Sequence, residues 1–255
     1  YIERYNKENS VSEYLKLISD AKKAVHIPVI ASVNCNTAHE WVGFAKRIEE
    51  AGADALEVNV YYVPTDKDKS AADYENIYFE LIAELKQKIK IPVIIKLGSG
   101  FTNPVYMVNQ LYFRKADAVV LFNRFYAPDI DLDEMKIGAA EVLSTAVELR
   151  NSLRWVSIIS GRVPEMDISG STGVHSGDAA IKMLLAGAKT VQVCSALYKN
   201  GLEYLTEIMD KLESWMLDHD FKSIEDFRGS MNYNKIKDPS IWERSQFMKY
   251  FSSFH

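Results

Sequence analysis

Short apolar runs without polar alternation recur along the chain, and segments with helical spacing of apolar residues separate them. The phrases "HIPVIASVN" and "KIPVIIKLG" resemble each other, and so do "AGADALEVN", "KADAVVLFN" and "AGAKTVQVCS". Such runs are typical of strands that are buried on both faces of a parallel sheet. The alternation of these strands with helices predicts an α/β fold.

The pattern predicts six strands, at residues 27–33, 54–60, 91–97, 117–123, about 165–169 and 189–195. Helical spacing is found at residues 37–50, 74–90, 104–115, 143–153, 176–186 and 202–217. Gly52 and Gly187 follow two of these helices, at the position where a helix end favours a left-handed residue.

Two architectures fit this order, a (β/α)8 TIM barrel and a doubly wound open sheet. No GxGxxG motif follows an early strand, which weakens the dinucleotide-binding alternative. A barrel has eight strands, so the first one or two strands are expected upstream of residue 1. We expect a single barrel domain over residues 1–255, in which the polar and aromatic residues 219–255 form a docked C-terminal tail.

Charge and hydropathy exclude several classes of protein. The net charge of −5 disfavours binding to nucleic acid. The longest apolar stretches have the length of strands, and the first ten residues are polar, so neither a membrane span nor a signal peptide is expected. Cys35 and Cys194 lack metal-type spacing. We therefore expect no metal site, no membrane contact and a reduced, cytoplasmic setting.

Polar side chains follow the predicted strands, at the end where barrel enzymes hold their chemistry. They are Asn34, Asn59, Lys96 and Asn123. Amides offer donors and acceptors, whereas lysine offers only donors, so together they suit a flat heterocycle with carbonyl and N–H groups. An alternative for Lys96 is a surface lysine whose stem packs at the strand end.

Two later strand ends favour an anion. Residues 169–173 ("SGSTG") precede one helix, and Cys194 and Ser195 precede the next. An anion at a helix N-terminus gains roughly 0.3–2 kcal/mol, and loops after the last two barrel strands often bind phosphate. Plain βα turns are the alternative. His175 is expected to cap a helix or face solvent rather than act as a base, and Cys35 is a weak candidate nucleophile.

With these residues in view, the chain resembles the dihydroorotate dehydrogenases, and most closely a bacterial dihydroorotate dehydrogenase-like branch. The matching phrases include "IPVIASVN", "ADALEVNVYYVPTD", "ADAVVLFNRFYAPDIDL" and "STGVHSGDAAIKMLLAGAKTVQVCSALYKNG". The resemblance implies an FMN-containing (β/α)8 barrel that oxidises dihydroorotate, or a related substrate, to orotate in pyrimidine biosynthesis. It also implies a homodimer. The electron acceptor stays open between fumarate, quinone, and NAD through a partner subunit.

The resemblance implies a role for each strand end. Asn34 and Lys96 would contact the flavin ring, and Asn59 and Asn123 would contact both flavin and substrate. Two pairs of residues would hold the FMN phosphate, namely Thr172 with Gly173 and Cys194 with Ser195. Thr172 stands where the family has a glycine.

The stretch Asn59–Pro64 departs from the family motif N-x-S-[CS]-P-N. The position of the base that removes a substrate proton becomes Tyr62, and a substrate-binding amide becomes Pro64. A tyrosine side chain has an ordinary pKa of about 10, so it accepts a proton only as a phenolate. Aromatic packing under a loop is the alternative for the two tyrosines. Arg124 either anchors an anionic substrate or pairs with Asp129 or Asp131.

Two other functions compete with the flavin oxidoreductase. One is a flavin-free barrel lyase or isomerase that acts on a phosphorylated metabolite. The other is a non-catalytic flavin-binding homologue that has lost its base.

Overall fold

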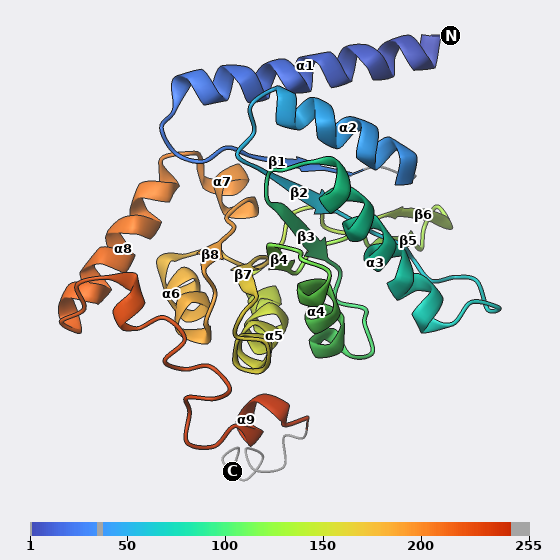
Figure 1. The fold of residues 1–255 in the computed structure, drawn as a ribbon. Helices are drawn as coiled ribbons and strands as arrows, with labels where there is room; N and C mark the ends of the chain where they lie inside the picture. The colour runs from blue at the N-terminus through green and yellow to red at the C-terminus, as the bar shows by residue number, and fades with distance from the viewer. Residues whose placement is uncertain (1, 35–37, 246–255) are drawn as a thin grey trace.

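Six parallel strands form one curled sheet, a half-barrel, in a computed structural model that describes residues 2–34 and 38–245 (Figure 1). Their order in the sheet is β1 (Ile30–Val33), β2 (Ala55–Asn59), β3 (Val93–Leu97), β4 (Ala118–Leu121), β7 (Asp167–Gly170) and β8 (Thr190–Val191). Neighbouring strands of the barrel-type sheet are thus also neighbours in the chain, apart from the inserted β5 and β6. This order confirms the predicted barrel-type α/β fold and excludes the strand reversal of a doubly wound sheet.

Helices connect the strands and pack on one side of the sheet. They are α2 (Ala38–Glu50), α3 (Ala71–Lys88), α4 (Pro104–Phe113), α5 (Leu149–Arg162) and α6 (Gly177–Ala186), and each contacts the next. Outward-facing strand residues and inward-facing helix residues make one apolar core, which includes Trp41, Leu85, Ile95 and Met183. Gly52 and Gly187 have φ values of 95° and 112°, so both predicted left-handed positions are confirmed.

The concave face of the sheet is open. Residues of β1 alternate between exposed and buried, and those of β3 between buried and half-buried. The expectation of burial on both faces is therefore wrong for these strands, because the six strands curl only partway round and no described element covers their inner face. A cleft of about 600 Å³ lies there, lined by polar side chains such as Ser32, Glu57 and Lys96.

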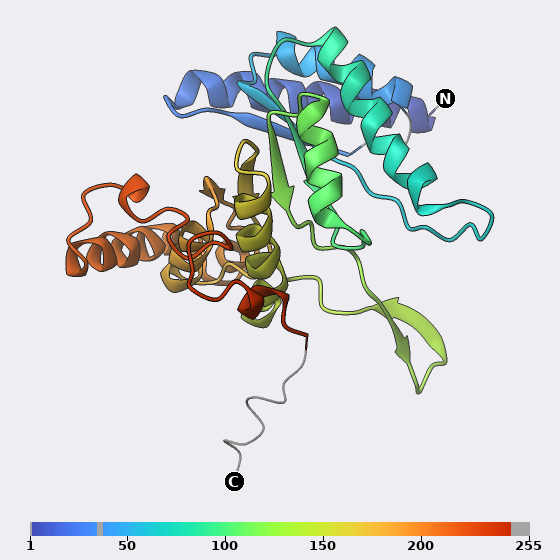
Figure 2. The same ribbon diagram turned by 60° about the horizontal axis from the view of Figure 1, so that its bottom comes forward.

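Several elements lie outside the predicted alternation. The long helix α1 (Ile2–Ala24) precedes the sheet and contacts α2. Strands β5 (Pro128–Asp131) and β6 (Lys136–Ala139) form an antiparallel hairpin that projects from the body (Figure 2). The short helix α7 (Ser195–Asn200) follows β8 directly. Among the described helices, none combines the length and the apolar character that a membrane crossing requires.

The C-terminal part of the described chain packs against α5 and α6. After α8 (Tyr204–Asp218) and a 3-10 turn at Ile224–Asp226, buried Phe227 joins an apolar cluster with residues of α6 and α8. The Gly229 N–H donates to the carbonyl of Leu184 at 3.0 Å. The last helix, α9 (Ser240–Glu243), contacts α5. The end of the predicted tail, residues 246–255, lies outside the described residues.

Candidate active site

Two amides meet where β2 and β4 end. The Asn123 Nδ2 donates to Asn59 Oδ1 at 2.6 Å, and the Asn123 N–H donates to the carbonyl of Leu97 at 2.8 Å. Asn59 is paired in register with Lys96 on the strand between them. The parallel register therefore brings three of the predicted polar strand ends to one rim of the half-barrel.

Lys96 belongs to a buried polar network. Its Nζ lies 2.8 Å from Gln192 Oε1 and 3.4 Å from Glu57 Oε1. Gln192 Nε2 donates to Glu57 Oε2 at 2.6 Å, and Ser32 Oγ donates to Glu57 Oε1 at 2.7 Å. Glu57 is buried and Lys96 keeps only 17% of its side chain exposed. The surface alternative for Lys96 is thus excluded by its contacts, since the ammonium points into the hollow of the sheet.

Most of the predicted cofactor residues line one cavity of about 540 Å³. Six of them line it: Lys96, Asn123, Thr172, Gly173, Cys194 and Ser195. The set comes from β3 and from the segments that follow β4, β7 and β8. The parallel sheet therefore joins residues that lie up to a hundred positions apart.

The turn after β7 has an unusual backbone. Thr172 and Gly173 have φ values of 72° and 78°, so two successive residues are left-handed. The Thr172 hydroxyl donates to the carbonyl of Phe122 at 2.8 Å, which offsets the strain of a side chain at this φ. A Cβ on Gly173 would lie 2.2 Å from the backbone nitrogen of Leu149, so only glycine fits there. Successive backbone N–H groups in such turns form concave anion sites.

A strap of residues 142–144 closes one side of the same cavity. Arg124 holds it by donating to the carbonyl of Val142 at 2.9 Å while its Nε pairs with Glu148 Oε2 at 2.7 Å. Of the two alternatives for Arg124, the pairing with Asp129 or Asp131 is therefore wrong, because the guanidinium binds Glu148 and Val142 instead.

Buried Ser144 joins this strap to α7 and to His175. Its N–H donates to Ser195 Oγ at 3.0 Å, its carbonyl accepts from Lys199 Nζ at 2.8 Å, and its hydroxyl lies 2.9 Å from His175 Nε2. Burial, and then the charge of Lys199, lower the pKa of His175 below its ordinary 6.5. His175 does not cap α6, whose N-cap is Ser176, and it is half-buried against Ser144.

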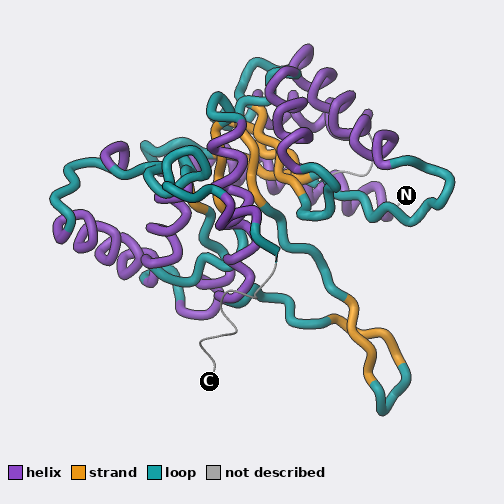
Figure 3. The backbone as a smooth tube through the Cα atoms, turned by 90° about the horizontal axis from the view of Figure 1, so that it is seen from below, coloured by secondary structure: helices purple, strands orange, loops and turns teal. Residues whose placement is uncertain are grey.

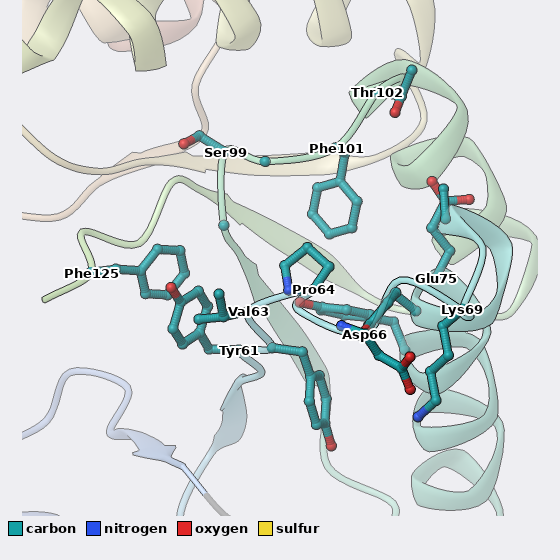
Figure 4. A pocket seen from close by; sticks show the side chains of 16 residues that line it. Tyr61, Val63, Pro64, Asp66, Lys69, Glu75, Ser99, Phe101, Thr102 and Phe125 are labelled. Carbon is teal, nitrogen blue, oxygen red and sulfur yellow. The ribbon is translucent and has the colours of Figure 1, made fainter. Parts of the chain in front are cut away.

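Tyr62 lines a different, aromatic cavity of about 460 Å³. Figure 4 shows this cavity, with Tyr61, Phe101 and Phe125 among its labelled walls. This cavity is bounded by residues 61–66, the first half of α3 and residues 98–102. Tyr62 meets Tyr78 edge-on at 6.4 Å between ring centroids, whereas Tyr61 stacks on Phe125 at 3.5 Å. Tyr62 is not among the residues that line the Lys96 cavity.

Of the other predicted residues, one lies away from the Lys96 cavity and one lies outside the described residues. Asn34 follows β1 and is exposed, and it does not line the Lys96 cavity. Cys35 lies outside the described residues. The sequence analysis missed Glu57 and Gln192. Each is a single polar residue within an apolar run, which is a signal in the sequence. Glu57 also lies two positions before Asn59, so both side chains face the same side of the strand.

Comparison with known proteins agrees with this geometry. The family model for dihydroorotate dehydrogenase matches residues 6–216. The catalytic subunit of dihydroorotate dehydrogenase B (NAD(+)) from Thermoplasma acidophilum is 29% identical over 207 residues, which are 79% of this chain and 68% of that protein.

Two further relatives are similar at the same level. The corresponding catalytic subunit from Thermoplasma volcanium is 28% identical over 85% of this chain and 71% of its own length. A putative dihydroorotate dehydrogenase A (fumarate) from Aeropyrum pernix is 28% identical over 85% of this chain and 72% of its own length. The chain belongs to the dihydroorotate dehydrogenase family, a family of oxidoreductases.

Proposed function

We propose that this chain is an FMN-dependent oxidoreductase that oxidises dihydroorotate, or a closely related dihydropyrimidine, to orotate. The observation that carries the proposal is the joint placement of Lys96, Asn123 and the two turns at residues 172–173 and 194–195 around one cavity. An electron acceptor takes the electrons afterwards, and the names of the relatives include both NAD and fumarate as acceptors.

The residues around the cavity fit FMN. Its volume of about 540 Å³ lies within the usual range of roughly 300–1,000 Å³ for cofactor sites. Within the described residues, the backbone N–H groups of Thr172, Gly173 and Ser195 have no hydrogen-bond partner, so they are free to bind a phosphate. Lys96 supplies a positive charge at the other side of the cavity.

When bound, FMN would accept a hydride from a ring carbon of the substrate. The Asn59–Asn123 pair would orient the substrate by hydrogen bonds to its ring amide groups. Lys96 would stabilise negative charge that develops on the reduced ring, while Glu57 and Gln192 fix the direction of its ammonium group. The proton from the neighbouring carbon would pass to the phenolate of Tyr62; the family motif alone supports this assignment, since Tyr62 lines the aromatic cavity and not the Lys96 cavity.

Flavin binding and turnover test the proposal directly. The purified protein should show the visible absorption of a flavin, release FMN on denaturation and reduce an acceptor with dihydroorotate. Lys96→Ala should weaken FMN retention or slow flavin reduction, because it removes the positive charge. The matched variant Lys69→Ala changes a lysine of the aromatic cavity and should leave FMN retention unchanged. A colourless, correctly folded protein would contradict the proposal.

The assignment of the proton to Tyr62 has its own test. Tyr62→Phe should lower turnover at least about tenfold, since a positioned proton acceptor contributes roughly 10²–10⁴-fold. FMN content should be unchanged. Tyr61→Phe is the matched control, because its ring stacks on Phe125 through the ring face rather than the hydroxyl. A loss of turnover in Tyr61→Phe alone would transfer the role to Tyr61, and an unchanged rate in both variants would refute a phenolic base.

A further inference from the structure

The aromatic cavity is a second site at the rim, and the proposed flavin chemistry uses only one of its residues, Tyr62. Six rings line this cavity: Tyr61, Tyr62, Tyr74, Tyr78, Phe101 and Phe125. They come from the segment after β2, from α3 and from the segments after β3 and β4, and Figure 4 labels three of them. The face of an aromatic ring is negative, so a cavity lined by rings attracts a positive group.

The rings are arranged so that their faces stay available to a ligand. Tyr78 meets Tyr62 and Phe101 edge-on, with 77° and 74° between the ring planes. An edge-to-face contact covers a face of only one of its two rings. Burial raises the pKa of Tyr78, and its hydroxyl donates to the carbonyl of Val60 at 3.3 Å, so this phenol stays uncharged within the wall. The three rings therefore offer electron-rich faces to a bound molecule.

Carboxylates outnumber cations on the lining of the cavity. Its charged side chains are those of Asp66, Glu75 and Lys69, and Figure 4 shows all three at the α3 side of the cavity. Glu75 is half-buried on α3, and within the described part of the chain it has neither a hydrogen bond nor an ion pair. A charge that is partly withdrawn from water is costly unless an opposite charge lies beside it. The position beside Glu75 therefore favours a cation.

An ammonium group of the chain itself already lies over one of these rings. Lys69 Nζ lies 5.9 Å from the centroid of the Tyr74 ring, which is within the range of a cation–π contact. The Lys69 side chain is exposed and has a flexible four-carbon stem, so it can move aside for a ligand that fits better. The contact shows that the rings of this cavity accept an ammonium group.

We propose that the aromatic cavity binds a small organic ammonium ion with apolar substituents. Its positive group would lie against the tyrosine rings beside Glu75, and its substituents would pack on the other rings. The volume of about 460 Å³ is within the usual range for small-molecule sites. An anion would meet two carboxylates in this cavity, and an uncharged molecule would leave Glu75 without a partner.

The cavity is within reach of solvent. The loop between β2 and α3 lies at the edge of the molecule, next to the start of α3, as Figure 3 shows from below. Residues 63–70 of this loop are exposed. A ligand can therefore enter from solvent without a rearrangement of the half-barrel, and its site is separate from the Lys96 cavity.

Binding of choline to the purified full chain, measured by isothermal titration calorimetry, tests this inference. Choline carries a trimethylammonium group, and 3,3-dimethylbutan-1-ol has the same shape without the charge. We expect choline to bind about tenfold more tightly than the alcohol, because ring faces and a carboxylate attract only the charged compound. Equal affinity for the two compounds would overturn the inference, and so would the absence of choline binding at millimolar concentrations.

Two single variants should change the affinity for choline in opposite directions. Glu75→Gln should weaken binding about threefold or more, because it removes the carboxylate beside the ammonium group. Lys69→Ala should tighten binding about threefold, because it removes a like charge that competes for the Tyr74 ring. Glu80→Gln and Lys67→Ala are the matched controls, since both side chains are exposed and neither lines the cavity. Both controls should leave the affinity unchanged.

The signs of these changes decide the inference. Weaker choline binding in Lys69→Ala would overturn it, and so would wild-type affinity in Glu75→Gln. Unchanged thermal unfolding should show that all four variants fold. The inference does not rest on the proposed function: a colourless protein that binds choline with these signs supports it, and a flavin-containing protein that does not bind choline refutes only the ammonium site.

Discussion

At the scale of single residues, Gly98 sets the position of the aromatic stack at the rim. A Cβ on Gly98 would lie 2.5 Å from the ring of Phe125, so the ring lies against bare backbone. Tyr61 stacks on the same ring, with 19° between the ring planes. The stack covers the end of β3 directly beyond Lys96. The absence of a side chain at position 98 therefore determines how the tyrosine-containing segment lies over the sheet.

Gly98→Ala should displace the Phe125 ring and lower the free energy of unfolding by about 1–3 kcal/mol, as overpacking does elsewhere. Gly100→Ala is the matched control, because a Cβ there meets nothing within 4 Å. Denaturant unfolding of both variants measures the difference. If the clash with the ring is the cause, Phe125→Ala should remove most of the penalty in a double-mutant cycle. Equal stability of Gly98→Ala and the wild type would contradict this account.

The residue scale also shows the limits of sequence reasoning about Tyr62. The family motif places the base at position 62, but the side chains of Tyr61 and Tyr62 contact different neighbours. Tyr61 reaches the stack with Phe125, and Tyr62 turns toward Tyr78. A motif fixes the position of a residue in the chain, whereas the side of the strand depends on the local backbone and on which neighbours accept a large ring.

At the scale of elements, the start of α3 forms a wall of the aromatic cavity. Ser70 is its N-cap and accepts from the Asp73 N–H at 3.3 Å, while Asp73 Oδ2 accepts from the Ser70 N–H at 2.7 Å. This reciprocal capping box satisfies two backbone donors at the helix start. It also fixes the direction in which α3 presents Tyr74 and Tyr78 to the cavity.

Ser70→Ala should lower the free energy of unfolding by about 0.5–2 kcal/mol, the usual cost of a lost N-cap. Hydrogen bonds from the Ser70 hydroxyl and N–H hold the pKa of Asp73 below its ordinary 3.8. That contribution is present above the ordinary pKa and is lost as the pH falls through the lowered folded pKa. The difference in melting temperature between wild type and variant should therefore shrink in strong acid. Ser99→Ala, in an exposed loop, should change little at any pH.

Elements were predicted well where the chain is apolar and poorly where it is polar. All six strands fall at predicted runs, although β8 is limited to Thr190 and Val191. The helix predicted at 143–153 begins as a 3-10 turn at Ala146–Glu148 and continues as α5 to Arg162. Helix α1 was missed because its sequence is rich in charge. The hairpin was missed because its alternation is short and its turn lacks the usual Asn-Gly or Asp-Gly signal.

At the scale of the whole molecule, the order of strands decides which side chains meet. Repeated apolar phrases indicate the strands, and the rule that barrel chemistry lies at strand ends places Asn59, Lys96 and Asn123 at one rim. These positions could be predicted from the sequence because a βα order nearly forces the strands into parallel register. The Arg124–Glu148 pair and the contact of His175 with Ser144 could not be predicted, since both depend on how loops of different length fold back over the rim.

One buried carboxylate affects the shape of the entire sheet. Glu57 on β2 binds Ser32 on β1, and it binds Gln192, which follows β8. These contacts join the first and last described strands of the half-barrel across its hollow, so the Glu57 side chain links the two edges of the sheet. The curvature of the sheet and the aim of the Lys96 ammonium are consequently not independent properties. A substitution that alters the curvature of the sheet will also alter the direction of the Lys96 ammonium, because both depend on the two carboxylate oxygens of Glu57.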